Sequence, residues 1–337
     1  MMKAVKLRPV GRPNKESINH MGKYGVIDLG SNTIRLIVYD VKNDKLQTYS
    51  SKNFKRIVNE KEMAGLAAFV DDGAFSVSGV ERAAGVLKTL AKHAGYFNCE
   101  TLNVFATAVI RNAVNCDDVV SALKKRTGLN ISVLSERDEA HLSFVGASTG
   151  KAMDAGTLID IGGGSTELSR VEGGRDFDDI SIGQGSLSSF ATCVTGVIPT
   201  ASEMDSIAEA FREKLSSIDD LGKYRTDVLF GVGGSARAAA KIVAQLHGSE
   251  SKPRQVSAED IREVLDACRA GSPAFAHAAL KASAERVHTM IPGCIIIDEL
   301  MRELGAGRLE VCKYGVREGY LVERVLKAKA VAPKSTS

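Results

Sequence analysis

The chain lacks tryptophan, and aromatic residues make up only 5% of its 337 residues. Proteins that bind single-stranded nucleic acids stack bases on aromatic side chains, so this class of function is disfavoured. The chain also has no apolar run of the roughly 18 residues that span a bilayer. Its basic N-terminal segment lacks the apolar stretch of a signal peptide. The sequence therefore predicts no contact with membranes.

Cysteine pairs are missing as well. The six cysteines form no C-x-x-C motif, and none stands at zinc-finger spacing from a histidine. Reduced thiols of this kind are typical of the cytosol. We therefore expect a cytoplasmic protein.

Basic charge is concentrated at the ends of the chain. Residues 1–23 carry a net charge of +5 and residues 321–337 a net +3, which leaves −5 for residues 24–320. A broad basic face for duplex nucleic acid is therefore not expected. A polyanionic substrate would need a local site, together with a metal ion, to neutralise it.

A strand–turn–strand pattern occurs twice, 132 residues apart. Asp28 aligns with Asp160, and Arg35 aligns with Glu167, without a gap. Each aspartate ends a short apolar strand, and a turn of small and polar residues follows it. A repeat of this length indicates two copies of one supersecondary unit. We therefore expect two similar lobes whose turns face a central cleft.

Hydrophobic periodicity and capping signals place the other elements. Strands are expected at residues 34–41, 46–50, 104–106, 131–134, 167–171, 177–182, 228–232 and 309–312. Helices are expected at residues 77–94, 117–126, 138–146, 293–304 and 317–329, and after the caps Thr200 and Ser257. This alternation predicts an α/β fold.

Three glycine-rich turns each follow a predicted strand, at residues 30–33 (GSNT), 162–166 (GGGST) and 231–235 (GVGGS). Successive backbone N–H groups in such turns form concave anion sites, and glycine lets the backbone approach a phosphate closely. Three such turns, two of them within the repeat, predict a phosphate-binding cleft.

Carboxylates flank these turns at Asp28, Asp160 and Glu167. Acidic oxygens beside a phosphate cradle would repel the substrate unless a divalent cation lies between them. Mg²⁺ suits this place, because it binds one or two carboxylates together with substrate phosphates. In the alternative reading, the two aspartates only accept hydrogen bonds from the N–H groups of the turns.

Six motifs now define a resemblance. They are residues 27–36 (IDLGSNTIRL), 106–112 (ATAVIRN), 136–142 (ERDEAHL), 160–168 (DIGGGSTEL), 231–237 (GVGGSAR) and 316–320 (VREGY). From about residue 24 to residue 326 the chain resembles the exopolyphosphatase / guanosine pentaphosphate phosphatase (Ppx/GppA) family. The fourth motif, with the string DIGGGSTE, is the most specific.

The resemblance implies an actin-like fold of the acetate and sugar kinase/Hsp70/actin type, with the active site between the lobes. The expected lobes are residues 24–146, onto which helix 317–330 packs back, and residues 147–316. Residues 1–23 and 331–337 are expected to be tails. Longer family members have a further helical C-terminal domain, so a compact two-domain enzyme is expected here.

The resemblance also implies the stepwise hydrolysis of a terminal phosphoanhydride with Mg²⁺ or Mn²⁺. It assigns water activation to Glu139 and metal binding to Asp160 and Glu167, to which Asp28 is added. The expected contacts with phosphate or substrate are Ser31, Asn32, Thr33, Arg35, Arg111, Gly162, Gly163, Gly164, Ser165, Thr166, Gly233, Gly234, Ser235 and Arg286.

The chain departs from the family pattern at three places. His141 replaces a frequent arginine, His288 replaces an aspartate, and residues 182–188 lack an arginine. We expect the two histidines to be surface or packing residues. The missing arginine leaves open how a long anionic substrate is held.

We expect inorganic polyphosphate to be the substrate, and guanosine pentaphosphate is the first alternative. A second alternative is a non-catalytic protein that senses either compound, which would need no water-activating base. A small-molecule kinase of the same superfamily would need an aspartate in the first lobe to activate its acceptor. A homodimer is compatible with the sequence, although no residue indicates it.

Overall fold

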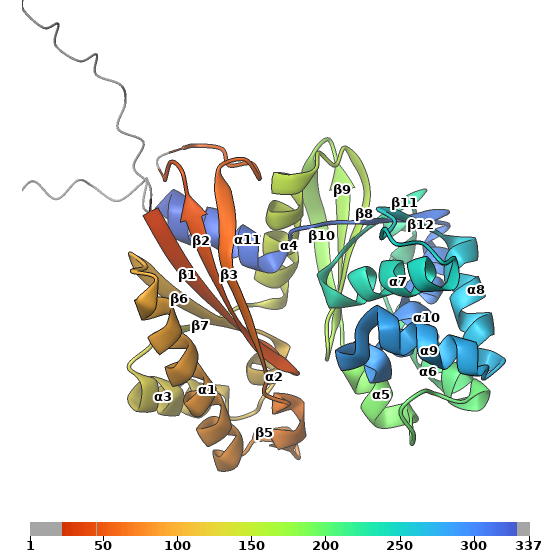
Figure 1. Cartoon of the computed structure of the whole chain (residues 1–337), viewed down its shortest axis with the longest axis horizontal. Helices are drawn as coiled ribbons and strands as arrows, with labels where there is room; N and C mark the ends of the chain where they lie inside the picture. The colour runs from red at the N-terminus through yellow and green to blue at the C-terminus, as the bar shows by residue number, and fades with distance from the viewer. Residues whose placement is uncertain (1–21, 45, 329–337) are drawn as a thin grey trace, which may run out of the picture.

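The computed structural model describes residues 22–44 and 46–328, which form two lobes, each built on one mixed β-sheet (Figure 1). The strand order is β3-β2-β1-β6-β7 in the first sheet and β10-β9-β8-β11-β13-β12 in the second. The first sheet contains β1 (Gly22–Leu29), β2 (Thr33–Val41), β3 (Phe54–Met63), β6 (Thr101–Ala106) and β7 (Ile131–Val133). The second contains β8 (Ala155–Ile161), β9 (Thr166–Glu172), β10 (Arg175–Ile182), β11 (Val228–Val232), β12 (Gln255–Ser257) and β13 (Arg308–Val311). The short strands β4 (Val70–Asp71) and β5 (Ala74–Phe75) pair separately.

Helices cover the outer face of each sheet. The first lobe has α1 (Val77–Tyr96), α2 (Ala108–Arg111) and α3 (Cys116–Thr127). The second has α5 (Ser186–Cys193), α6 (Ala201–Ser216), α7 (Gly233–Leu246), α8 (Ala258–Arg269), α9 (Pro273–Ser283) and α10 (Val287–Leu304). Ile27 and Leu36 of the first sheet share a core with Leu87 of α1, and Ile159 of the second shares one with Ile296 of α10. Burial of these apolar faces is the main force that forms each lobe.

The two sheets repeat one arrangement, which confirms the duplicated actin-like fold. In each lobe a β-hairpin, β1–β2 or β8–β9, is followed by parallel pairing of its first strand with a later strand, β6 or β11. Asp28 pairs with Arg35 across the first hairpin, and Asp160 pairs with Glu167 across the second. The alignment read from the sequence is therefore also the structural register.

Helix α4 (Glu136–Gly150) lies between the two sheets (Figure 1). Its Leu142 packs in a core with Tyr24 of β1 and Tyr320, whereas its Phe144 packs in a core with Leu158 of β8. One helix therefore carries apolar side chains toward both lobes.

The C-terminal segment packs against α4 and the first sheet. It begins with α11 (Val316–Tyr320) and continues as the π-helical stretch Leu321–Lys327. The ring of Tyr320 stacks on Phe105 with 4.8 Å between the centroids. A side chain at Gly319 would collide with the backbone carbonyl of Leu142 on α4. Glycine is therefore needed here for the two helices to approach each other.

One predicted strand is wrong. Residues 46–50 form an irregular segment with a bend at residues 47 and 48, and the third strand of the first sheet is β3, which runs along the sheet edge from Phe54 to Met63. Five of its ten residues are charged, a composition that edge strands use to avoid pairing with other chains. No element was predicted for this charged stretch from the sequence. Helix α10 also begins earlier than expected, at Val287, and contains Pro292.

No helix among the described residues is long and apolar enough to cross a membrane. Of the predicted N-terminal tail, Gly22 and Lys23 belong to β1, and the preceding residues lie outside the described part of the chain. The predicted tail at residues 331–337 also lies outside it.

Candidate active site

A cavity between the lobes is lined by the three glycine-rich turns. These turns follow β1, the central strand of the first sheet, and β8 and β11, which are neighbours at the centre of the second. In α/β folds, ligands bind outside the carboxyl ends of such strands. The first two turns touch, because a Cβ placed on Gly163 would lie 3.3 Å from the Cβ of Ser31.

The two hairpin turns have the same backbone hydrogen bond. The N–H of Gly30 donates to the carbonyl of Thr33 at 3.1 Å, and the N–H of Gly162 donates to the carbonyl of Ser165 at 2.9 Å. Both turns present small side chains to the cavity. Each can therefore let a phosphate approach the backbone.

The third turn is the N-terminus of α7. Gly233 has a φ of 77°, a conformation that favours glycine, and it lies against the carboxylate of Asp160. No side chain caps this helix N-terminus. Its free N–H groups and the helix dipole therefore favour an anion in the cavity. The guanidinium of Arg286 lies directly over Gly234, so a side chain at this position would have to displace it.

Carboxylates meet on the α4 side of the cavity. Asp160 accepts a hydrogen bond from Ser143 of α4 at 2.9 Å. Glu167 is buried, and it accepts hydrogen bonds from Ser165 at 2.6 Å and Ser181 at 3.1 Å. Burial raises the pKa of both carboxyl groups, and repulsion from Glu139 raises that of Glu167 further. Acidic groups that raise each other's pKa in this way suit a divalent cation, because its charge would lower their pKa values again.

Glu139 of α4 faces the same cavity. Ser135 caps the helix and accepts a hydrogen bond from the N–H of Asp138, so the first turn of α4 is fixed. Burial raises the pKa of Glu139 to about 7, although the neighbouring Arg111 opposes the shift. A carboxylate with a pKa near neutrality can accept a proton at physiological pH.

Arg111 does not line the cavity, contrary to the simple expectation of a phosphate contact. Its Nη1 donates to Glu139 at 2.5 Å and to the carbonyl of Leu134 at 3.2 Å. Its Nη2 is buried and has no partner among residues 22–44 and 46–328. In this structure Arg111 therefore holds the Glu139 side chain from behind.

Three other predicted residues also lie behind the cavity wall. Ser235 donates to the carbonyl of Ile161, and Thr166 donates to the carbonyl of Gln184. Glu167 accepts a hydrogen bond from the hydroxyl of Ser165, which lies between it and the cavity. The predicted residues that line the cavity are Asp28, Ser31, Asn32, Thr33, Arg35, Glu139, Asp160, Gly162, Gly163, Gly164, Ser165, Gly233, Gly234 and Arg286.

Asp28 is engaged by a cation. Its carboxylate accepts a hydrogen bond from Nη1 of Arg317 at 2.8 Å, and both side chains are largely buried. Arg35, opposite Asp28 in the hairpin, has a pKa lowered to about 10 by burial and by repulsion from Arg317. The first hairpin therefore carries one aspartate and one arginine, to which Arg317 of α11 adds a positive charge, whereas the second hairpin carries two carboxylates.

The sequence analysis missed four cations that line the cavity. They are Arg56, Arg237, Lys313 and Arg317. Arg237 and Arg317 stand inside two of the six motifs and could have been included on that ground. Arg56 and Lys313 stand outside the motifs, and only the packing of β3 and of the segment after β13 brings them to the cavity.

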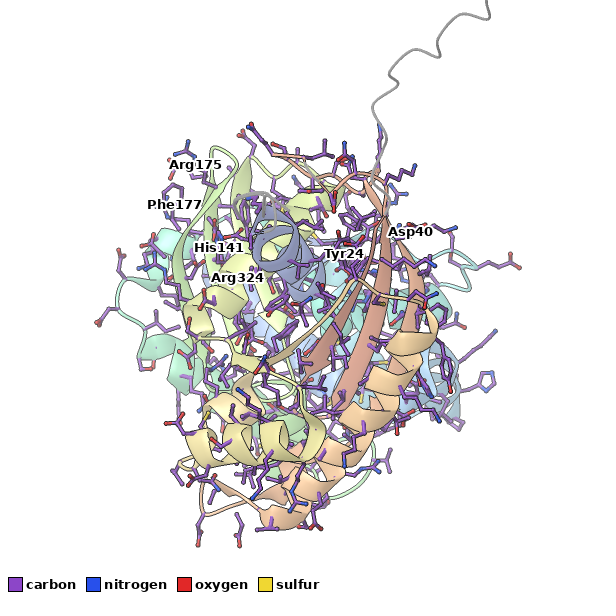
Figure 2. All side chains as sticks on the ribbon, turned by 90° about the vertical axis from the view of Figure 1, so that its left-hand side faces the viewer. Tyr24, Asp40, His141, Arg175, Phe177 and Arg324 are labelled. Carbon is purple, nitrogen blue, oxygen red and sulfur yellow. The ribbon has the colours of Figure 1, made fainter. Side chains whose placement is uncertain are left out.

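The two histidines that depart from the family pattern differ from each other. His288 makes an edge contact with Phe190, with 5.1 Å between the ring centroids. His141 bonds Asp176 of β10 at 2.6 Å and Glu323 of the C-terminal segment at 3.1 Å. The bond to Asp176 is the main reason that the pKa of His141 rises to about 9. Figure 2 shows His141 and Arg324 close together where α4 meets this segment.

Known proteins are similar to this chain in sequence and fold. The profile of the Ppx/GppA phosphatase family matches residues 38–328. "Exopolyphosphatase 1" of Mycobacterium tuberculosis is 26% identical over 312 residues, which cover 90% of this chain and 88% of that protein. Its counterpart in Mycobacterium leprae is 26% identical over 313 residues, 90% and 89% of the two chains.

Solved structures agree on the fold. An exopolyphosphatase from Cytophaga hutchinsonii has a TM-score of 0.77 at 20% identity and covers 91% of this chain and 98% of its own. A Ppx/GppA family member from Aquifex aeolicus has a TM-score of 0.72 at 22% identity, covering 91% and 99%. The chain is therefore a hydrolase that belongs to the Ppx/GppA phosphatase family.

Proposed function

We propose that this chain removes the terminal phosphate from a phosphoanhydride chain, and that inorganic polyphosphate is its substrate. One observation carries the proposal: the buried carboxylate of Glu139 faces a cavity lined by three phosphate-cradling turns. A binding protein would need the turns but not a proton acceptor among them. The arrangement therefore favours hydrolysis over sensing.

The turns and arginines position the substrate. N–H groups of the turns and the start of α7 bind the oxygens of the terminal phosphate. Arg35, Arg286 and Arg317 surround the same space and neutralise its charge. In phosphoryl transfer, positioning and charge neutralisation supply most of the rate enhancement.

Glu139 activates the water. The water oxygen attacks the terminal phosphorus, the bond from that phosphorus to the bridging oxygen breaks, and Glu139 accepts the proton of the water. Inorganic phosphate and a chain shorter by one unit are the products. The hydrogen bond from Arg111 orients the Glu139 carboxylate for this step.

Asp160 lines the cavity and would bind Mg²⁺ or Mn²⁺ directly, whereas Glu167, buried behind Ser165, would add its charge to the site. Carboxylate oxygens suit these hard cations. Such a cation neutralises charge on the transferring phosphoryl group. The role first given to Asp28 is less well supported, because Arg317 already binds its carboxylate.

Guanosine pentaphosphate presents the same terminal anhydride and is the alternative substrate. A kinase would transfer the phosphate to a small acceptor molecule. We favour hydrolysis over this reaction, because Glu139 suits the activation of water. The test is phosphate release with Mg²⁺ from long polyphosphate, tripolyphosphate and guanosine pentaphosphate, measured side by side.

Two variants make this test specific. Glu139→Gln should lower kcat by roughly 10²- to 10⁴-fold, the usual contribution of a general base. Glu136→Gln is the matched control, because Glu136 is exposed on the first turn of the same helix. Wild-type protein that binds all three compounds and releases phosphate from none would contradict the proposal and favour a sensor.

A further inference from the structure

A second cavity, of about 720 Å³, lies where α4, β10 and the C-terminal segment meet. Its wall includes His141 of α4, which Figure 2 labels, and Glu323 of the C-terminal segment. Asp176 and Asp179 of β10 complete this group of side chains. No described residue lines both this cavity and the interlobe cavity. The second cavity is therefore separate from the candidate active site.

A β-bulge brings the two aspartates to the same face of β10. In the pairing of β10 with β9, two residues, Asp178 and Asp179, stand opposite the single residue Ser169. Residues three apart in a regular strand point to opposite faces, and the extra residue of a bulge removes this alternation. Asp176 and Asp179 therefore both reach His141. One carboxylate oxygen of each and one ring nitrogen of the histidine lie within 4.8 Å of one another.

Negative charge exceeds positive charge around this histidine. His141 bonds Asp176 through Nδ1 at 2.6 Å and Glu323 through Nε2 at 3.1 Å. Among residues 22–44 and 46–328, no arginine lies within ion-pair distance of Asp176, Asp179 or Glu323. Lys327 reaches only Glu323, at 3.9 Å. Three carboxylates thus share one imidazole and one distant lysine, and a divalent cation would balance their charge.

Two buried polar atoms beside these side chains have no hydrogen-bond partner in the described part of the chain. They are Oδ1 of Asp179 and Oγ of Ser169, whose side chain is fully buried. Burial raises the pKa of Asp179, and the nearby hydroxyl of Ser169 opposes this shift only in part. Buried polar atoms in folded proteins nearly always bind a protein group, a water or an ion. Asp179 therefore keeps a capacity for a ligand that the ion pairs of His141 leave unused.

The donor atoms indicate which ion fits. One imidazole nitrogen with two carboxylate oxygens suits Zn²⁺, whereas Mg²⁺ prefers oxygen donors alone. When Nδ1 of His141 binds the ion, its proton passes to solvent, and Asp176 exchanges a hydrogen bond for a bond to the ion. The Nε2–H group continues to donate to Glu323. A carboxylate in this place orients the histidine in many metal sites.

We propose that His141, Asp176 and Asp179 form a zinc site, with Glu323 as the hydrogen-bond acceptor behind the histidine. The ion joins β10 of the second lobe to α4, the helix that lies between the two sheets. Its role is to stabilise the packing of α4 on the second sheet. The site is distinct from the Mg²⁺ site proposed at Asp160, and it does not depend on the proposed function.

The test is calorimetric titration of the full chain with Zn²⁺ in excess Mg²⁺, which occupies sites made of oxygen ligands alone. The wild type should bind Zn²⁺ saturably, and His141→Gln and Asp179→Asn should each weaken this binding at least tenfold. Asp178→Asn is the matched control in the same bulge, because asparagine also tolerates the φ of 54° found there. It should bind Zn²⁺ like the wild type. His247→Gln removes the histidine of another group of possible ligands and should also leave the affinity unchanged.

Thermal unfolding gives a second readout and shows whether each variant folds without zinc. Zn²⁺ should raise the Tm of the wild type and of Asp178→Asn by a few degrees, and it should leave that of His141→Gln unchanged. If His141→Gln does not fold, Asp179→Asn decides the test.

A wild type without saturable Zn²⁺ binding would show that these side chains form only an ion-pair cluster, and would overturn the site. Equal affinities in the wild type, His141→Gln and Asp179→Asn would do the same, as would a loss of binding in His247→Gln alone. Neither readout uses phosphate release, so failure of the zinc site and failure of the proposed function are distinguished.

Discussion

The two hairpins at the centre of this molecule share a backbone but differ in charge. Both have the same strand pairing and the same hydrogen bond across the turn. At the equivalent register position the first hairpin has Arg35 and the second has Glu167. The duplicated backbone provides two anion cradles. In the proposed mechanism, the exchange of this one residue gives the first hairpin a cation for the substrate and the second a carboxylate for the metal.

The partners of the two aspartates follow the same division. Asp28 binds a cation, Arg317, whereas Asp160 binds a neutral hydroxyl, Ser143. Asp28 is therefore already neutralised, and Asp160 keeps its charge available. Ser143 belongs to α4 and Arg317 to α11, which packs against α4, so the difference depends on how these two helices pack.

Within the comparison of the two hairpins, the largest effect is expected at Glu167. Glu167→Gln keeps the volume and an oxygen that accepts from Ser165 and Ser181, but it removes the charge. We expect kcat to fall on the order of 100-fold and the Mg²⁺ concentration for half-maximal activity (the Mg²⁺ requirement) to rise, as for other groups that hold or orient a metal. Phosphate release across a Mg²⁺ series measures both. An unchanged Mg²⁺ requirement would exclude Glu167 from the metal site.

The next prediction concerns the contact between α4 and α11. Gly319→Ala should lower the free energy of unfolding by about 3 kcal/mol, because the added methyl group collides with the Leu142 carbonyl. Gly85→Ala in α1 is the control, since a Cβ there meets open space and helix propensity favours alanine by about 0.5–1 kcal/mol. Urea unfolding of both variants measures the difference. Equal stability would show that the helices can separate without cost.

A smaller effect is expected at Arg35, the counterpart of Glu167. Arg35→Gln removes a charged phosphate contact, so KM should rise about tenfold while the Mg²⁺ requirement stays the same. Steady-state kinetics at fixed and varied Mg²⁺ separate the two quantities. A change in the Mg²⁺ requirement instead would mean that the hairpins do not divide their roles as described.

The smallest effect should come from His141. Its folded-state pKa of about 9 exceeds the ordinary value of 6.5, so its stabilisation is complete below pH 6.5 and is lost as pH rises toward 9. Because the side chain is partly exposed, we expect a loss of only about 1 kcal/mol. Between pH 6 and pH 9.5, the Tm of thermal unfolding should fall more steeply for the wild type than for His141→Gln. Parallel curves would show that the ion pairs do not contribute.

Local features of the site were predictable from the sequence, and long-range ones were not. The turns, the repeat and the strand ends depend on residues that are neighbours in the chain. The place of Glu139 at the cavity came only from the family resemblance, since an isolated glutamate on a helix carries no signal of its own.

Other features depend on packing between distant segments. Arg111 was expected at the substrate, but its side chain turns to Glu139 because α2 lies beside the start of α4. Arg56 reaches the cavity from β3, where Glu318 of α11 accepts a hydrogen bond from its Nε at 2.9 Å. No spacing in the sequence links residues 56 and 318. Charged edge strands such as β3 resemble loops for the same reason, since their partner strand is not visible in the local pattern.

The division of roles between the hairpins is tested most directly by Asp28→Asn and Asp160→Asn, with phosphate release measured across a Mg²⁺ titration. Thermal unfolding first establishes that both variants are folded. The account predicts that Asp160→Asn raises the Mg²⁺ concentration for half-maximal activity on the order of tenfold to 100-fold. Asp28→Asn should leave this concentration close to the wild-type value. An equal shift in the two variants would contradict the account and return Asp28 to the metal site.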